Sequence, residues 1–411
     1  MLKVPHHHWL LELTSLPTAS GREGRVVEWI ERWVAARKQC NLTRDRYGNL
    51  VIKRRKHSTK NPPIYFTAHL DHPAFVVREI LNERELIADF RGGVDQEYFV
   101  GTKVALHSMA PYSPPSQGGA RGGLRQTSHS SHKKAADPTL PQLLPKREGS
   151  SEQPQRGTIT TLTPPLPGKT LDKSATIRFG KAHGAKVNDV LTWSLTPTRI
   201  KKDRVTAPAC DDLAGVAAAL AAFDAVITSK NDVDLRLLFT LCEEVGFVGA
   251  IGACKARTME KNALVIALEN SRSFAESPIG GGPIVRVGDR TSTFDPDLTY
   301  RIGKVAEALA REDKTFRWQR KLMPGGTCEA SAYQTYGHIA TCLCLPLGNY
   351  HNMNEATKKI DHETISLADY DNLVKLLAAV GQQLHDPKLA PPLKPRLDAL
   401  FKSRETLLEK R

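Results

Sequence analysis

The chain has 411 residues, of which 40% are hydrophobic and 6% aromatic, and its formal net charge is +14. This length suffices for one large α/β domain and a smaller second one. A basic balance is compatible with nucleic-acid binding, but no basic stripe with interleaved aromatic residues supports that function, and we do not expect it.

Targeting and redox features are few. The longest apolar run, which begins at Leu213, is too short to span a membrane, and the N-terminus lacks a signal-peptide pattern. The seven cysteines are odd in number and form no Cys-x-x-Cys pair, which argues against a disulfide framework and for a reducing compartment. We therefore expect a cytoplasmic protein with no membrane partner.

The first third of the chain predicts helices and then strands. Residues 9–37 predict a helical segment interrupted by a turn at PTASG, because Trp29, Ile30 and Val34 recur at helical spacing. Residues 61–72 predict a buried strand that ends in His69 and Asp71. Three short strand-like segments follow, AFVVREI, ELIADF and GTKVALH.

The composition then changes over residues 111–155, which are dominated by Pro, Gly and Ser. Such a segment cannot bury enough apolar surface to offset its ordering entropy, so we expect a disordered insert. Strand-like pieces resume afterwards in RGTITTL, ATIRFG and DVLTWSL. The insert is therefore expected to interrupt a β-rich domain at a loop between two strands.

Strands alternate with helices in the second half of the chain. A helix is predicted from Leu213, a strand in DLRLLFTL, a second strand from Ala263 and a third from His338. Further helices are predicted over residues 299–311 and after Ser366. The alternation indicates an α/β fold whose mostly parallel sheet has helices on both faces.

We divide the chain into three parts on this basis. Residues 1–72 and 206–385 are expected to form the α/β domain, and residues 73–205 an inserted β-rich domain. Residues 386–411 are expected to form a C-terminal tail helix.

Polar residues follow the predicted strands or precede the predicted helices, where ligands of α/β sheets bind. They are His69, Asp71, Asp211, Asp212, Glu243, Glu244, Glu269 and His351. Singly, each has an ordinary explanation: a surface histidine, a helix N-cap or a solvated turn. Together they would make one edge strongly negative and self-repelling. Two divalent cations would remove that cost, and imidazole and carboxylate ligands suit zinc first, with cobalt or manganese as alternatives.

A division of roles follows for a site with two metal ions. His69 and Glu269 would hold one ion, Glu244 and His351 the other, and Asp211 would bridge both. Glu243 is then left beside the ions without a ligand role, where a carboxylate can act as a general base. Asp71, two residues beyond His69, would orient the imidazole of that histidine.

This order of residues resembles the dinuclear metallo-aminopeptidases of the tetrahedral aminopeptidase and glutamyl aminopeptidase family, some of whose members carry cellulase or endoglucanase names. Supporting motifs are SGREGRVVEWI, DRYGNL, GGVDQEYFVGTKV, CDDLAG, EEVGFVGA, GGGPIVRVGDR and PGGTCEASAY. The resemblance implies a zinc-peptidase catalytic domain acting on peptides and the same assignment of ligands, base and orienting residue. It also implies that the inserted domain serves homo-oligomer assembly, from dimers up to dodecamers.

Three departures from the family pattern affect the predicted specificity. Glu269 stands where these aminopeptidases usually carry Asp, whereas related di-zinc carboxypeptidases and deacylases carry Glu, so those activities are the alternative function. GGTDA becomes GGTCEA, and Pro-x-Arg-Tyr-x-His becomes PLGNYH, with Gly348 and Asn349 where Arg and Tyr are usual. A non-catalytic scaffold or nucleic-acid-binding protein is a third reading, but the retention of every predicted ligand argues against it.

Overall fold

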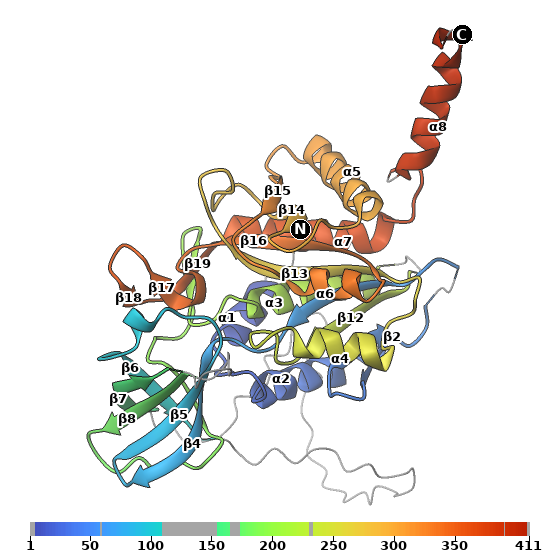
Figure 1. Cartoon of the computed structure of the whole chain (residues 1–411). Coiled ribbons are helices and arrows are strands. Elements are labelled where there is room, and N and C mark those ends of the chain that lie inside the picture. The colour runs from blue at the N-terminus through green and yellow to red at the C-terminus, as the bar shows by residue number, and fades with distance from the viewer. Residues whose placement is uncertain are drawn as a thin grey trace, which may run out of the picture.

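The computed structural model describes residues 5–57, 60–108, 154–164, 173–229, 233–389 and 391–408. Its centre is an eight-stranded sheet in the order β1-β2-β12-β3-β13-β16-β14-β15 (Figure 1). The bounds are β1 Cys40–Arg44, β2 Leu50–Arg54, β12 Leu235–Thr240, β3 Ile64–His69, β13 Leu264–Arg272, β16 Ile339–Leu347, β14 Ile284–Asp289 and β15 Gln319–Met323.

The central strands of this sheet are parallel. β3 pairs in parallel with β12 and β13, and β13 pairs in parallel with β16. Antiparallel pairs occur toward the edges, between β1 and β2, β2 and β12, and β16 and β14. The predicted α/β class with a mostly parallel sheet is confirmed. β14 and β15 were not predicted. The edge strand β15 reads QRKLM, which has no apolar run, and only its last residue is buried.

Helices cover both faces of the sheet. The central strand β3 is therefore buried along its whole length, and its side chains alternate between two cores. Phe66 and Ala68 lie in one core and Tyr65 in the other. The first core is covered by α1 (Pro5–Leu13), α2 (Gly24–Ala35), α3 (Leu213–Ile227), α5 (Pro296–Glu312) and α7 (Leu367–Gln383). The second core is covered by α4 (Val248–Ala256) and α6 (Glu329–Thr335).

Sequence signals explain three of these helices. α3 reads LAGVAAALAAF and is apolar on every side, as a helix buried at the centre of an α/β layer requires. Asp295 is the N-cap of α5, its side chain accepts the Leu298 N–H, and Pro296 occupies the first helical position. α7 begins at Ser366, which caps the Asp369 N–H.

A closed β-barrel lies beside this layer, in the order β4-β5-β8-β7-β6-β9 (Figure 1). Its strands are β4 Ala74–Asn82, β5 Glu85–Arg91, β6 Lys103–His107, β7 Gln155–Thr163, β8 Lys173–Phe179 and β9 Val190–Trp193. Phe75, Phe90, Phe99 and Trp193 pack largely edge to face in its core. This barrel is the predicted inserted β-rich domain.

The predicted disordered insert requires one correction. Gln155 already belongs to β7, where it faces Leu106 of β6, so the predicted boundary runs too far. Residues 111–153 lie outside the described parts of the chain.

Smaller elements complete the fold. β10 (Arg199–Lys201), β11 (Arg204–Ala207) and β19 (Glu363–Ser366) form a three-stranded sheet, and β17 (Met353–Asn354) pairs with β18 (Lys359–Ile360). Short 3-10 turns are η1 (Gln96–Tyr98), η2 (Tyr350–Asn352) and η3 (Glu405–Leu407), and α8 (Leu393–Arg404) projects away from the body (Figure 1). Among the described residues, every helix is too short or too polar to cross a membrane.

Candidate metal centre

The predicted ligands come together at the carboxyl ends of three neighbouring parallel strands, as α/β sheets lead one to expect. His69 is the last residue of β3, Glu243 and Glu244 follow β12, and Glu269 lies in β13. Asp211 precedes α3, and His351 lies in the turn η2. These side chains form three overlapping groups of three residues. Within each group the ligand atoms lie within 4.8 Å of one another.

Asp211 lies between the two histidines. Its Oδ1 is 3.4 Å from Nε2 of His69, and its Oδ2 is 3.5 Å from Nε2 of His351. Oε1 of Glu269 lies 3.8 Å from Nε2 of His69, and Oε1 of Glu244 lies 3.4 Å from Nε2 of His351. The cluster thus consists of two halves that share one carboxylate.

These distances fit divalent cations. Metal–ligand bonds of about 2.1 Å at tetrahedral angles place two ligand atoms about 3.4 Å apart. Oδ1 of Asp211 and Oε1 of Glu244 are buried, and each lacks a hydrogen-bond partner within the described residues. Buried oxygens of this kind are costly unless a donor or a cation satisfies them. The donor set of imidazole and carboxylate suits zinc, cobalt or manganese.

Hydrogen bonds on the far side of each ring orient the two histidines. Nδ1 of His351 donates to the carbonyl oxygen of Gly93 at 2.6 Å, and Nδ1 of His69 donates to the carbonyl oxygen of Asp71 at 3.1 Å. A carbonyl only accepts, so Nδ1 carries the proton in both rings. In the neutral form of each ring the lone pair is therefore on Nε2, which faces Asp211.

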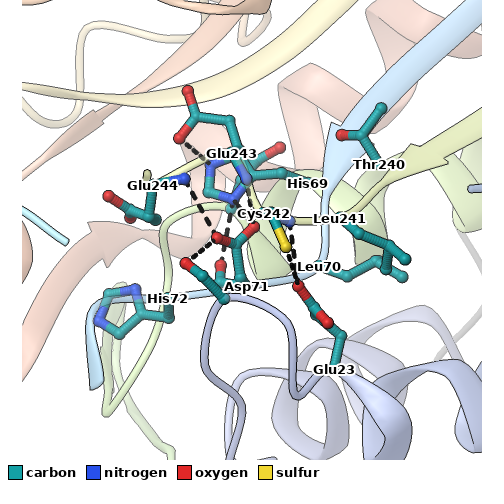
Figure 2. Close-up of polar contacts among 12 residues, drawn as sticks. Glu23, His69, Leu70, Asp71, His72, Thr240, Leu241, Cys242, Glu243 and Glu244 are labelled. Atoms are coloured by element: carbon teal, nitrogen blue, oxygen red, sulfur yellow. Dashed lines mark hydrogen bonds and ion pairs between the residues drawn. The ribbon is translucent and has the colours of Figure 1, made fainter. Parts of the chain in front are cut away.

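The Asp71 carboxylate does more than the predicted orientation of His69. Its Oδ1 lies 3.5 Å from Nδ1 of His69 and accepts the Glu243 N–H at 2.9 Å. Its Oδ2 accepts the Glu244 N–H at 3.1 Å and the Ser20 hydroxyl at 2.5 Å. Figure 2 shows this carboxylate between the His69 ring and the backbone of the two glutamates. Asp71 therefore fixes the loop that carries both glutamates.

The chain leaves strand geometry before the two glutamates, as the sequence predicts. Cys242 has a φ of 55° and Gly246 a φ of 109°. Glu23 supports this turn from α2's N-terminal side by accepting the Cys242 N–H (Figure 2). The turn gives Glu243 and Glu244 different surroundings: Glu244 faces His351, whereas Oε2 of Glu243 lies 3.9 Å from Nε2 of His69.

Burial and mutual repulsion perturb the protonation of the cluster. Burial, followed by the neighbouring carboxylates Glu244 and Asp71, raises the pKa of Glu243 well above its usual value. Burial and the Asp211 carboxylate do the same to the pKa of Glu269. Burial lowers the pKa of His69, but the surrounding carboxylates, Glu243 first, outweigh it and raise that pKa. Without cations the cluster thus retains protons, and bound cations would take their place.

Two supporting residues were missed by the sequence analysis. Glu363 in β19 accepts the backbone N–H groups of Cys210, Asp211 and His351, and burial raises its pKa to about 7. His72 donates from Nδ1 to the Asp211 carbonyl oxygen at 2.6 Å. No local pattern marks either residue, and a glutamate at the start of the short, fully buried strand ETIS is only a weak signal for such a role.

Asp212 is not the N-cap that an Asp-Asp pair before a helix usually provides. It occupies the N-cap position of α3, but its side chain accepts none of the helix N–H groups. Its Oδ1 accepts from the Asn270 side chain instead. The cysteines beside the site, Cys210, Cys242 and Cys328, belong to none of the ligand groups among the described residues.

A cavity of about 440 Å³ opens onto the cluster. Its lining includes Asp211, Glu243, Glu244, Glu269 and His351 on one side, and Phe274, Arg286, Met323 and Tyr350 among the remaining residues. The Arg286 side chain is buried, donates to Ser271 Oγ at 3.1 Å, and comes no closer than 4.0 Å to Asp289. Its Nε has no partner within the described residues. The cavity wall therefore carries a buried cation that is only partly compensated.

Comparison with known proteins gives one family. Residues 176–367 match the profile of the M42 glutamyl aminopeptidase family. An aminopeptidase from the archaeon Desulfurococcus kamchatkensis is 22% identical, with a TM-score of 0.67 over 92% of this chain and 95% of its own. A TET peptidase from Pyrococcus horikoshii is 21% identical, with a TM-score of 0.64 over 92% and 99%, and can assemble into a tetrahedron or a large octahedral shell.

An endoglucanase from Thermotoga maritima is 18% identical, with a TM-score of 0.59 over 91% of this chain and 96% of its own. At these identities the three structures share the fold with this chain. The matched segment 176–367 adds more, because it carries Asp211, Glu244, Glu269 and His351 together with Glu243. This segment of the chain is therefore similar to the M42 glutamyl aminopeptidase family.

Proposed function

We propose that this chain is a metal-dependent aminopeptidase that removes N-terminal residues from peptides. His69, Asp211, Glu244, Glu269 and His351 would hold two divalent cations, zinc first, and Glu243 would be the general base. The observation that carries the proposal is the position of Asp211, whose two oxygens face the two histidines at 3.4 and 3.5 Å. One carboxylate so placed can serve two ions at once.

The cations, when bound, supply Lewis-acid activation of the scissile carbonyl and of water. The chain supplies the handling of protons. Glu243 lines the cavity and has no ligand role in this scheme, so its carboxylate can take a proton from the attacking water and return it to the leaving amine. Asp71 holds the Glu243 backbone while this happens. Gly93 and Asp71 accept the Nδ1 protons of the two histidines, so that in the neutral rings the lone pair lies on Nε2, toward the ligand cluster.

The cavity wall supports a preference for an acidic N-terminal residue. Arg286 is buried and lines the same cavity as Glu243, and a guanidinium binds a carboxylate with two parallel hydrogen bonds. The family profile that residues 176–367 match is named for glutamyl aminopeptidase. We expect peptides that begin with Glu or Asp to be cleaved faster than peptides that begin with Leu or Lys.

Hydrolysis of matched peptides with free and with acetylated N-termini tests the reaction type. The metal-loaded protein should shorten only the free peptides, one N-terminal residue at a time, as read by mass spectrometry. Removal of the metal with a chelator should abolish this activity, and added zinc should restore it. Activity confined to the acetylated set would instead support a di-zinc deacylase or carboxypeptidase, which the glutamate at position 269 favours.

We also propose a homo-oligomer, between a dimer and a dodecamer. The Pyrococcus peptidase assembles into closed shells, and another solved structure that is 21% identical to this chain is a dodecamer. In this proposal residues 1–72 and 206–385 form the catalytic domain, residues 73–205 the assembly domain, and residues 386–411 a tail helix. Light scattering coupled to size exclusion would give the mass, and a monomer would contradict the proposal.

A further inference from the structure

Tyr350 lies beside the metal centre and has no role in the scheme above. It lines the large cavity and also a second, smaller one of about 210 Å³, so it stands where the two meet. Its ring stacks on the imidazole of His351, with centroids 3.8 Å apart and planes inclined by 22°. The family pattern carries its Tyr two residues before the His, whereas this chain has Asn349 there and the phenol directly before His351.

The Tyr350 hydroxyl is free to act. The hydroxyl forms no hydrogen bond within the described part of the chain. Its oxygen is not fully buried, and the residue lines both cavities. A phenol has an ordinary pKa of about 10, so this hydroxyl is a hydrogen-bond donor at neutral pH.

The backbone holds this residue rigidly. Asn349, His351 and Asn352 all have φ between 54° and 65°, a left-handed conformation that is costly for residues other than glycine. Side-chain bonds maintain it: the Asn349 amide donates to the His362 carbonyl, and Glu363 accepts the His351 N–H. The stacked ring and the fixed turn leave the phenol little freedom to rotate away from the cavity.

A fixed donor beside the ligands can stabilise charge that develops during the reaction. Attack of water on the scissile carbonyl converts its oxygen into an oxyanion, and a preorganised donor aimed at that oxygen lowers the barrier. We propose that Tyr350 is a further catalytic residue, whose hydroxyl donates a hydrogen bond to the oxyanion of the tetrahedral intermediate. The inference rests on the proposed peptidase function.

Two substitutions separate the hydroxyl from the ring. Tyr350→Phe removes the hydroxyl and keeps the ring that stacks on His351, and Tyr350→Leu removes both. We expect Tyr350→Phe to lower kcat about a hundredfold, the effect typical of losing one oxyanion donor, with KM within about twofold of wild type. Its metal content, read by elemental mass spectrometry, should equal that of the wild type. Tyr350→Leu should additionally weaken metal retention, because His351 loses its stacking partner.

A binding measurement gives a readout that is independent of turnover. The probe is a phosphinic dipeptide built on the N-terminal residue that the wild type removes fastest, since its tetrahedral phosphinate mimics the intermediate. Tyr350→Phe should bind this probe more weakly by the same factor as kcat falls, yet bind the free amino acid product as the wild type does. A Phe variant with unchanged kcat and unchanged probe affinity would overturn the inference, and so would a Phe variant that loses its metal.

Measurements on the wild type separate a failure of the proposed peptidase function from a failure of the proposed role of Tyr350. A wild type that neither cleaves free peptides nor binds the phosphinate would overturn the peptidase function, and the role of Tyr350 with it. A wild type that does both, paired with an unimpaired Phe variant, would overturn the role of Tyr350 alone.

Discussion

The metal centre and the barrel core are about equally buried, yet they are built from opposite chemistry. Phe75, Phe90 and Phe99 in the barrel are fully buried and contact one another edge to face. His69 and Asp211 in the metal centre are as inaccessible to solvent, but they belong to a cluster of charged groups. Burying aromatic surface stabilises a fold, whereas burying carboxylates without cations destabilises it.

The comparison separates stability from function within one chain. The barrel should contribute to the free energy of unfolding whether or not metal is present, while the cluster becomes favourable only when cations occupy it. Substitutions in the barrel should therefore change the free energy of unfolding, whereas substitutions in the metal centre should change turnover or metal affinity. Four experiments test this difference.

The largest expected effect is on turnover by Glu243→Gln. The glutamine keeps the shape of the side chain but cannot accept the proton, so kcat should fall by about 10² to 10⁴. Metal content should persist, and the metal-free protein should be at least as stable to urea as the wild type, because a buried carboxyl that resists ionisation is gone. Glu312→Gln, at an exposed glutamate that ends α5, is the matched control and should change neither quantity. Turnover that persisted in Glu243→Gln would refute the assignment of the base.

The next largest effect is on stability, by Ile177→Ala in the barrel. Ile177 is fully buried in β8, opposite Leu86 and Ile159, and removing a side chain of this size from a core costs about 2–5 kcal/mol. Urea denaturation measures the loss, and Ile177→Val should cost only about 0.5–1.5 kcal/mol. Zinc affinity of the still-folded protein should stay at the wild-type value. A parallel loss of metal affinity in both variants would show that the two regions are energetically coupled.

A smaller effect is expected from Asp71→Asn. The amide offers one oxygen and one NH₂ group, so it cannot accept from both the Glu243 and Glu244 N–H groups as the carboxylate does. Loss of such a supporting partner typically costs about 10- to 100-fold in metal affinity, which competition with a fluorescent chelator would measure. Ser20→Ala removes only the hydroxyl that donates to Asp71 and should have a weaker effect. Equal losses in the two variants would mean that the hydroxyl, and not the carboxylate charge, organises the loop.

The smallest effect concerns pH and His107 in the barrel. Burial, together with the charge of Arg25, lowers the pKa of His107 to about 4, from 6.5 for a free histidine. Between these two values the unfolded chain binds a proton that the folded chain does not, so this contribution to stability is complete above the window and is lost as the pH falls through it. Urea denaturation at a series of pH values compares wild type with His107→Gln. The stability difference should shrink as the pH falls from about 7 to about 4, and a difference that stayed constant would exclude a neutral, half-buried imidazole.

Much of the centre was predictable from the sequence because its ligands sit at the ends of recognisable strands. The buried run before His69 and the one before Glu243 each identify a strand, and parallel strands present their carboxyl ends at one edge. The roles of the residues gathered there, as ligands or as base, stay predictions until metal binding and turnover are measured.

The supporting residues that were not predicted from the sequence depend on contacts between distant segments. Glu363 is 152 residues from Asp211, whose N–H group it accepts, and its strand β19 is only four residues long. His72 follows His69 closely, but its partners lie at Asp211 and Asn352. Neither pairing leaves a periodic pattern, because it is created by tertiary packing. β15 was not predicted for a different reason, since it lies at the edge of the sheet, where polar residues are tolerated and hide the strand pattern.

The hydrogen bond between His351 and the Gly93 carbonyl connects the two regions that the chemistry separates. Gly93 follows β5 of the barrel, and its neighbour Gly92 adopts a φ of 130° at a place where a Cβ would lie 2.7 Å from Pro73. The loop that follows this barrel strand thus sets the tautomer of a histidine in the metal centre. Replacing the barrel with a foreign domain, or deleting it, would leave the His351 ring free to rotate. A variant that kept Gly92 and Gly93 in place would retain the hydrogen bond to His351. The smallest transplantable unit of the metal centre therefore includes a corner of the barrel.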